Sequence, residues 1–173
     1  MSLTKEISDK KVNFEFNKEF INVFSKKIRD NDTEFLNRTL KELHPADSAD
    51  LIENLIAENR SKLIELEGFN LDPEIFIELN ESIQTEIFLL LSIESIANIL
   101  KHLESDNALK ILENLDEKKK NTVLDKLPPK DRFLLQEGLS SPEDSAARIM
   151  QREFTAIPSN WSVGQTIDYL REN

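Results

Sequence analysis

Apolar residues recur every twelve positions between residues 79 and 139. Leucine occupies positions 79, 91, 103, 115, 127 and 139. Eight and nine residues after each of the first four leucines comes an apolar pair, from Ile87–Phe88 to Val123–Leu124. After the fifth leucine the pair is Leu135–Gln136, so the pattern ends there. Polar and turn-forming residues fill the rest of each unit, which predicts a repeated structural element.

One continuous helix cannot keep this pattern on one face, because twelve residues at about 3.6 per turn rotate each repeat by about 120°. We therefore predict a short helix and a tight turn in each unit. Residues that favour helix N-caps follow the repeat leucines at Ser92, Ser105 and Asp116. Pro128–Pro129 suits the first turn of another helix. Short helices that bury one face each must stack, so the predicted fold is an all-α, right-handed superhelix.

Longer helices are predicted before the repeats. One of them has a single apolar face made of residues four apart, namely Phe16, Phe20, Phe24 and Ile28. The next begins at a cap within Asn31–Thr33 and carries Leu36, Leu40 and Leu43. Two proline-containing segments, His44–Asp47 and Asp72–Glu74, predict further helix starts.

The last part of the chain has a different pattern. Glu153–Pro158 predicts a short extended segment that ends at proline, and Trp161–Leu170 predicts the start of a helix. This alternation is typical of the beginning of a second domain.

The net charge of −11 is concentrated in one part of the chain. Residues 42–100 contain thirteen acidic and two basic residues and account for −11, while residues 1–41 and 101–173 carry +2 and −2. Such an acidic block repels nucleic acid and anionic lipid and attracts cations or a basic partner. A solubilising surface is the simpler interpretation on charge alone.

Other features of the composition exclude several kinds of chemistry. The chain has no cysteine, which excludes disulfides, thiolate metal sites and cysteine nucleophiles. No signal peptide or membrane-length apolar stretch is present, and a cytosolic domain is expected. We find no phosphate-binding loop, zinc-protease motif or nucleophile elbow, so we do not expect an enzyme. His44 and His102 stand apart and are expected to be surface or cap residues.

Three stretches of the sequence resemble the MgtE family of magnesium transporters. Leu43–Leu51 is similar to the family's N-terminal L-H-P-x-D-x-A-D-L signature. The repeats ending in Leu127–Arg132 are the second stretch. Pro142–Met150 resembles the P-E-D-S-A-G-R-L-M junction that leads into the first CBS motif, although Ala147 stands where the family usually has glycine.

The resemblance implies a helical, cytoplasmic, magnesium-sensing N domain of a dimeric transporter. It divides the chain into an N-terminal tail (1–15), the helical superhelix domain (16–140), and the junction with the start of a CBS domain (141–173). In the family, Mg²⁺ between the N domain, the CBS domains and a connecting helix favours the closed pore. The implied partners are therefore those CBS domains, that helix and a second copy of the full-length protein.

The resemblance also implies two metal-binding residues. Glu86 and Asp106 align with positions where family members place carboxylates that bind Mg²⁺. One turn after Asp106 the family can have another acid, but this chain has Lys110, which cannot bind a cation. The sequence therefore predicts fewer or weaker ions here, or a direct salt bridge from Lys110 to the CBS side.

Two other functions remain open at this point. The repeats also resemble the helical domains of flagellar motor switch proteins, which are protein-interaction scaffolds that need no metal. Alternatively, the chain belongs to a soluble sensor protein that has an MgtE-type N domain and CBS motifs but no pore.

Overall fold

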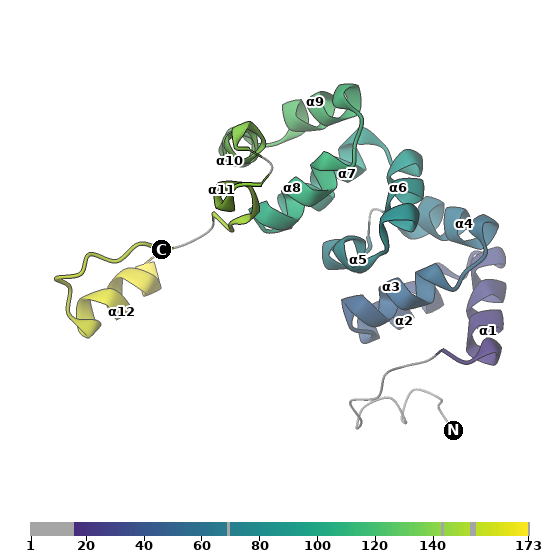
Figure 1. Cartoon of the computed structure of the whole chain (residues 1–173). Helices are drawn as coiled ribbons and strands as arrows, with labels where there is room; N and C mark the ends of the chain where they lie inside the picture. The colour runs from purple at the N-terminus through teal and green to yellow at the C-terminus, as the bar shows by residue number, and fades with distance from the viewer. Residues whose placement is uncertain (1–15, 69, 143, 153–154, 173) are drawn as a thin grey trace.

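The computed structural model describes residues 16–68, 70–142, 144–152 and 155–172, and in these ranges it has twelve α-helices and no strand (Figure 1). Their bounds are α1 Lys18–Arg29, α2 Thr33–Glu42, α3 Pro45–Glu53, α4 Ala57–Glu67, α5 Pro73–Glu78, α6 Glu81–Leu90, α7 Ile93–Lys101, α8 Ser105–Glu113, α9 Glu117–Lys126, α10 Pro129–Ser140, α11 Ala146–Ile149 and α12 Val163–Glu172. The predicted all-α class is confirmed.

The helices form a curved array that runs from α1 to α11 (Figure 1). Most of the closest packing joins helices two places apart along the chain, as in the pairs α2–α4, α3–α5, α4–α6, α7–α9 and α8–α10. This arrangement is the stack of short helices that the repeat predicts.

Five of the six repeat leucines lie just after a helix, and Leu139 lies in the last turn of α10. Leu79, Leu91 and Leu127 are the C-cap residues of α5, α6 and α9, and each is at most 7% exposed. The apolar pairs from Ile87–Phe88 to Val123–Leu124 lie in the last turns of their helices and are buried. Each unit therefore places its apolar residues in the core at the C-terminal end of a helix.

The helix starts follow the predicted caps with one exception. Ser92 and Asp116 accept hydrogen bonds from Ser95 N and Lys119 N, at 3.1 and 2.9 Å. Ser105 is not the N-cap of α8, because Glu104 has that position. The Ser105 side chain is instead buried and accepts a hydrogen bond from Arg152 N at 2.9 Å, which ties the start of α8 to the segment after α11.

The N-terminal helices pack as their phenylalanine pattern predicts. Phe24 and Ile28 of α1 are fully buried, while Phe16 and Phe20 are partly buried and stack on one another with ring centroids 5.4 Å apart. Asp32 caps α2 through Phe35 N at 3.1 Å. This region anchors α4, which packs against both α1 and α2.

Two of the three lysines in the run 118–120 have partners, Lys119 on another helix and Lys120 on its own helix. Lys119 donates from Nζ to the carbonyl of Phe88 and, at 3.4 Å, to that of Leu91, at the end of α6. Lys120 pairs with Glu117 at 2.7 Å. Only Lys118 has the solvent-facing side chain expected for such a run.

The C-terminal part differs from the prediction in detail. Residues 155–158 form neither helix nor strand, and residues 153–154 of the predicted extended segment lie outside the described residues, as do 1–15 and Glu143. α12 begins at Val163, two residues after the predicted start, and has no buried residue. No helix of the described ranges is long and apolar enough to cross a membrane.

Candidate functional site

Glu86, the first predicted metal ligand, lies on α6 and is paired with an arginine. Its Oε1 and Oε2 accept hydrogen bonds from Arg60 Nε at 3.1 Å and Arg60 Nη2 at 3.0 Å. This two-bond arrangement is the strong form of an arginine–carboxylate pair. The Glu86 side chain is still 35% exposed, so part of the carboxylate faces solvent.

Arg60 itself is buried within α4, at 6% exposure. Its Nη1 donates at 3.3 Å to the carbonyl of Ile52, near the end of α3, and at 3.0 Å to that of Leu55, just after this helix. Glu86 is therefore the counter-ion of a buried guanidinium that holds α3, α4 and α6 together. A cation that approaches Glu86 meets a carboxylate whose charge is already compensated, which weakens the attraction.

Asp106, the second predicted ligand, lies in the first turn of α8 and has an unused oxygen. Its Oδ1 is buried and has no hydrogen-bond partner within the described ranges. Asp106 lines a cavity of about 330 Å³ between α8, α9 and α11. A buried acceptor without a partner is unusual, and this one could accept from a bound water or contribute an oxygen ligand to a cation.

Basic residues dominate the rest of this cavity. Arg148 pairs with Glu113 through Nε at 2.5 Å and also donates to the carbonyl of Gly138. Lys120 is engaged with Glu117, whereas Lys110 donates to Asn107 Oδ1 at 3.3 Å and has no carboxylate partner among the described residues. The positive charge of Lys110 therefore lies beside Asp106 uncompensated, and it opposes a cation there.

The two predicted ligands do not share a cavity. Glu86 belongs to the α4–α6 contact and Asp106 to the cavity beside α11. Within the part of the chain that the structure describes, no three histidine or acidic side chains gather closely enough to hold a metal. Among the described residues, neither carboxylate has enough neighbouring ligands to complete a metal site.

Sequence reasoning missed the two arginines that organise these positions. Arg60 and Glu86 are 26 residues apart, and Arg148 and Glu113 are 35 apart, so no local pattern joins them. The one available signal was the scarcity of basic residues in the acidic block, where Arg60 is one of two. The histidines were predicted correctly, since His44 Nδ1 accepts from Ala46 N and the His102 ring contacts the Asn98 carbonyl.

Comparison with known proteins gives a family match. The model of the MgtE intracellular N domain matches residues 43–144. A comparison with curated protein sequences found no match.

Two solved structures have similar folds. The soluble part of a magnesium transporter matches with a TM-score of 0.71 at 20% identity, over 90% of this chain and 61% of that one. The cytosolic domain of the Mg²⁺ channel MgtE, in complex with ATP, matches with a TM-score of 0.74 at 24% identity, over 88% of this chain and 62% of that one. The chain thus spans about three fifths of the length of each.

Proposed function

Because the chain belongs to the MgtE intracellular N domain family, we propose that it is the regulatory, Mg²⁺-sensing domain of an MgtE-type magnesium transporter. The observation that carries the proposal is the family match over residues 43–144, which covers the signature, the repeats and most of the acidic block. The proposed setting is the cytoplasmic side of a membrane, in a homodimer whose CBS domains and connecting helix face this domain.

In this proposal the acidic surface acts as a switch. Residues 42–100, with a net charge of −11, repel any other acidic surface that approaches them. Mg²⁺ would supply the positive charge that allows two such surfaces to meet. Asp106 offers an oxygen that no described residue uses, and Glu86 offers the exposed side of its arginine-paired carboxylate.

The charges around these residues predict a weak response. Arg60 compensates Glu86, and Lys110 stands beside Asp106 without a carboxylate partner in the described chain. Lys110 is well placed for a direct salt bridge to an acidic surface of the CBS side. We therefore expect this domain to contribute fewer oxygen ligands than one with an acid at position 110, and an affinity in the millimolar range, about 10⁻³ M.

The test is the effect of Mg²⁺ on the thermal stability of the protein extended through its CBS pair. We expect millimolar Mg²⁺ to raise Tm, and we expect Asp106→Asn and Glu86→Gln to reduce that rise. Each variant is compared with itself without Mg²⁺, because Glu86→Gln also removes the counter-ion of Arg60. Glu81→Gln, on the exposed first turn of α6, is the matched control and should leave the rise unchanged.

The substitution Lys110→Glu sharpens the test, because it restores an acid beside Asp106 and should increase the Mg²⁺-dependent rise. A wild-type protein whose Tm does not respond to Mg²⁺ would contradict the sensing role. In that case the acidic block is a surface only, and a metal-independent interaction scaffold becomes the better interpretation.

A further inference from the structure

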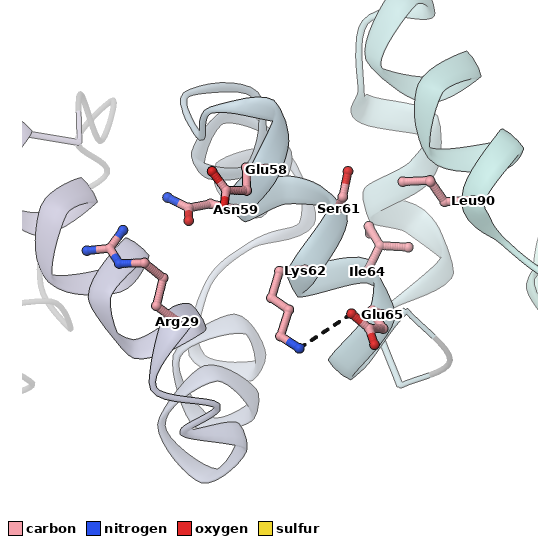
Figure 2. Close-up of a pocket in the computed structure, with 8 residues that line it drawn as sticks. All are labelled: Arg29, Glu58, Asn59, Ser61, Lys62, Ile64, Glu65 and Leu90. Atoms are coloured by element: carbon pink, nitrogen blue, oxygen red, sulfur yellow. Dashed lines mark hydrogen bonds and ion pairs between the residues drawn. The ribbon is translucent and has the colours of Figure 1, made fainter.

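The cavity beside α11 differs from the other large cavity in how its charged walls are held. A groove of about 600 Å³ runs along α4, between α1 and α6, but its charged side chains are largely exposed, and Lys62 and Glu65 pair with each other (Figure 2). The cavity of about 330 Å³ beside α11 instead contains Asp106, whose Oδ1 has no partner among the described residues, and the Arg148 side chain, which is only 10% exposed. The contacts of Arg148 therefore affect what this cavity can bind.

One face of α8 supplies both carboxylates of the cavity. Asp106, Lys110 and Glu113 are spaced by four and three residues, so they lie on the same side of the helix. Lys120 of α9 and Arg148 of α11 complete the charged part of the lining, which has two acidic and three basic side chains. If Arg148 withdrew, the lining would keep two of each. The position of α11 therefore sets the charge of the cavity.

Hydrogen bonds, rather than apolar burial, hold α11 in place. None of the four residues of this helix is buried. Arg148 donates to Glu113 of α8 at 2.5 Å and to two carbonyls at the C-terminal end of α10, at 3.0 and 3.4 Å. Just after α11, the backbone N–H of Arg152 donates to the buried Ser105 side chain of α8 at 2.9 Å. An element held in this way can open locally without disturbing the core.

We propose that residues 146–152 form a latch on this cavity, and that Arg148 competes with a divalent cation for it. In the closed latch Arg148 neutralises Glu113 and adds positive charge to the cavity wall. When the latch opens, Glu113 and Asp106 remain as two carboxylates without an arginine partner, and a cation is opposed less. The cation is the Mg²⁺ of the proposed function, on which this inference rests.

The coupling between the latch and the cation works in both directions. If an open latch favours cation binding, a bound cation must favour the open latch by the same factor. The chain continues from the latch toward α12, so opening releases this part of the chain from α8 and α10. The cation thereby changes how firmly the helical domain holds the segment that follows it.

Amide exchange of the 173-residue chain tests the latch without any metal. The Arg152 amide is the reporter, because its hydrogen bond ends on a side chain 47 residues away. Arg148→Gln and Glu113→Gln should each speed its exchange about tenfold, since each removes the charged contact between α8 and α11. Arg132→Gln is the matched control and should leave this exchange unchanged, because Arg132 also donates to carbonyls near a helix end but does not line the cavity.

Titration with MgCl₂, followed by the amide NMR shifts of α8, tests the competition. We expect Arg148→Gln to bind Mg²⁺ about fivefold more tightly than the wild type, because a positive charge leaves the cavity and Glu113 loses its partner. Glu113→Gln also opens the latch but removes a carboxylate, so it should bind Mg²⁺ no more tightly than the wild type. Opposite effects of two variants that open the same latch distinguish competition from a purely structural role.

Equal exchange of the Arg152 amide in the wild type and in Arg148→Gln would overturn the latch. Equal Mg²⁺ binding by these two proteins, including no binding by either, would overturn the competition. Either failure is distinguishable from a failure of the sensing role, because that role is judged by the effect of Mg²⁺ on the Tm of the wild-type protein extended through its CBS pair.

Discussion

Arg60 determines the role of Glu86, one of the two predicted metal ligands. The guanidinium is buried, and its donors are used by the Glu86 carboxylate and by backbone carbonyls near the end of α3. A buried arginine requires such partners, because an unpaired charge is costly to remove from water. Glu86 therefore has a structural role whether or not it also serves a metal.

Replacing Arg60 by methionine should destabilise the domain substantially. The change removes the charged donor of the Leu55 and Ile52 carbonyls, of which Ile52 O keeps its bond from Leu55 N, and it removes the partner of Glu86, so we expect a loss of about 2–4 kcal/mol in the free energy of unfolding. Urea titration measures this loss. Lys62→Met, on the same helix but in an exposed ion pair, should cost less than about 1 kcal/mol. Equal losses for the two variants would refute a structural role for Arg60.

The contribution of Asp32 to the stability of the fold depends on pH. Its hydrogen bond from Lys27, and then that from Phe35 N, lower the pKa of its carboxyl group below the usual value. A lowered pKa in the folded state means that the ionised form stabilises the fold. This contribution is complete above the unfolded pKa of about 3.9 and is lost as the pH falls through the folded value.

The variant Asp32→Asn tests that dependence, because asparagine keeps the helix cap but loses the charge. We expect its Tm to lie below that of the wild type at pH 7, and the difference to vanish as the pH falls below about 3.9. Thermal melts between neutral and acidic pH provide the measurement. A difference that stays constant with pH would show that the pair with Lys27 contributes nothing.

At the scale of the element, sequence and structure agree best at the starts of the helices. The side chains of Ser92 and Asp116 can cap a helix that begins within three residues, so a local pattern is enough to predict them. The prediction that Ser105 caps α8 fails, because the Ser105 side chain instead binds Arg152 N, 47 residues away. Local rules therefore predict where a helix begins unless a distant segment also uses the cap residue.

The ends of the helices depend more on such distant segments. Lys119, on α9, donates to two carbonyls at the end of α6, about 30 positions earlier in the chain. A cation near a helix C-terminus is favourable, both as a donor and through the helix dipole. Lys119 thus connects two repeat units in a way that a twelve-residue pattern does not reveal.

The neighbouring lysine offers a matched test of this connection. Lys119→Met should lower the free energy of unfolding by about 1–2 kcal/mol, because two C-terminal carbonyls lose a charged donor. Lys118→Met removes the same charge from an exposed side chain and should change it by less than about 0.5 kcal/mol. Denaturant melts compare the two. If both variants change the free energy of unfolding equally, the contact with α6 does not contribute to stability.

At the scale of the whole molecule, the repeat predicted the architecture but did not predict the candidate site. Leucines every twelve residues cannot all lie on one face of a continuous helix, so the pattern favours short stacked helices. They do not say which charged side chains meet across the stack, and for that reason the pairing of Glu86 with Arg60 was not foreseen. The resemblance to a family proposed Glu86 and Asp106, and the structure shows that Glu86 is paired with Arg60 whereas Asp106 Oδ1 has no hydrogen-bond partner among the described residues.

The packing of most helices on a helix two places away along the chain has a consequence for folding kinetics. Contacts between segments close in sequence need little loop closure, so a chain of this type should fold rapidly. Its stability is also the sum of neighbouring interfaces, which allows one end to open while the other stays folded. Amide hydrogen exchange should therefore be slowest in α6–α8 and faster toward α1 and α11, and uniform protection would indicate a single cooperative unit.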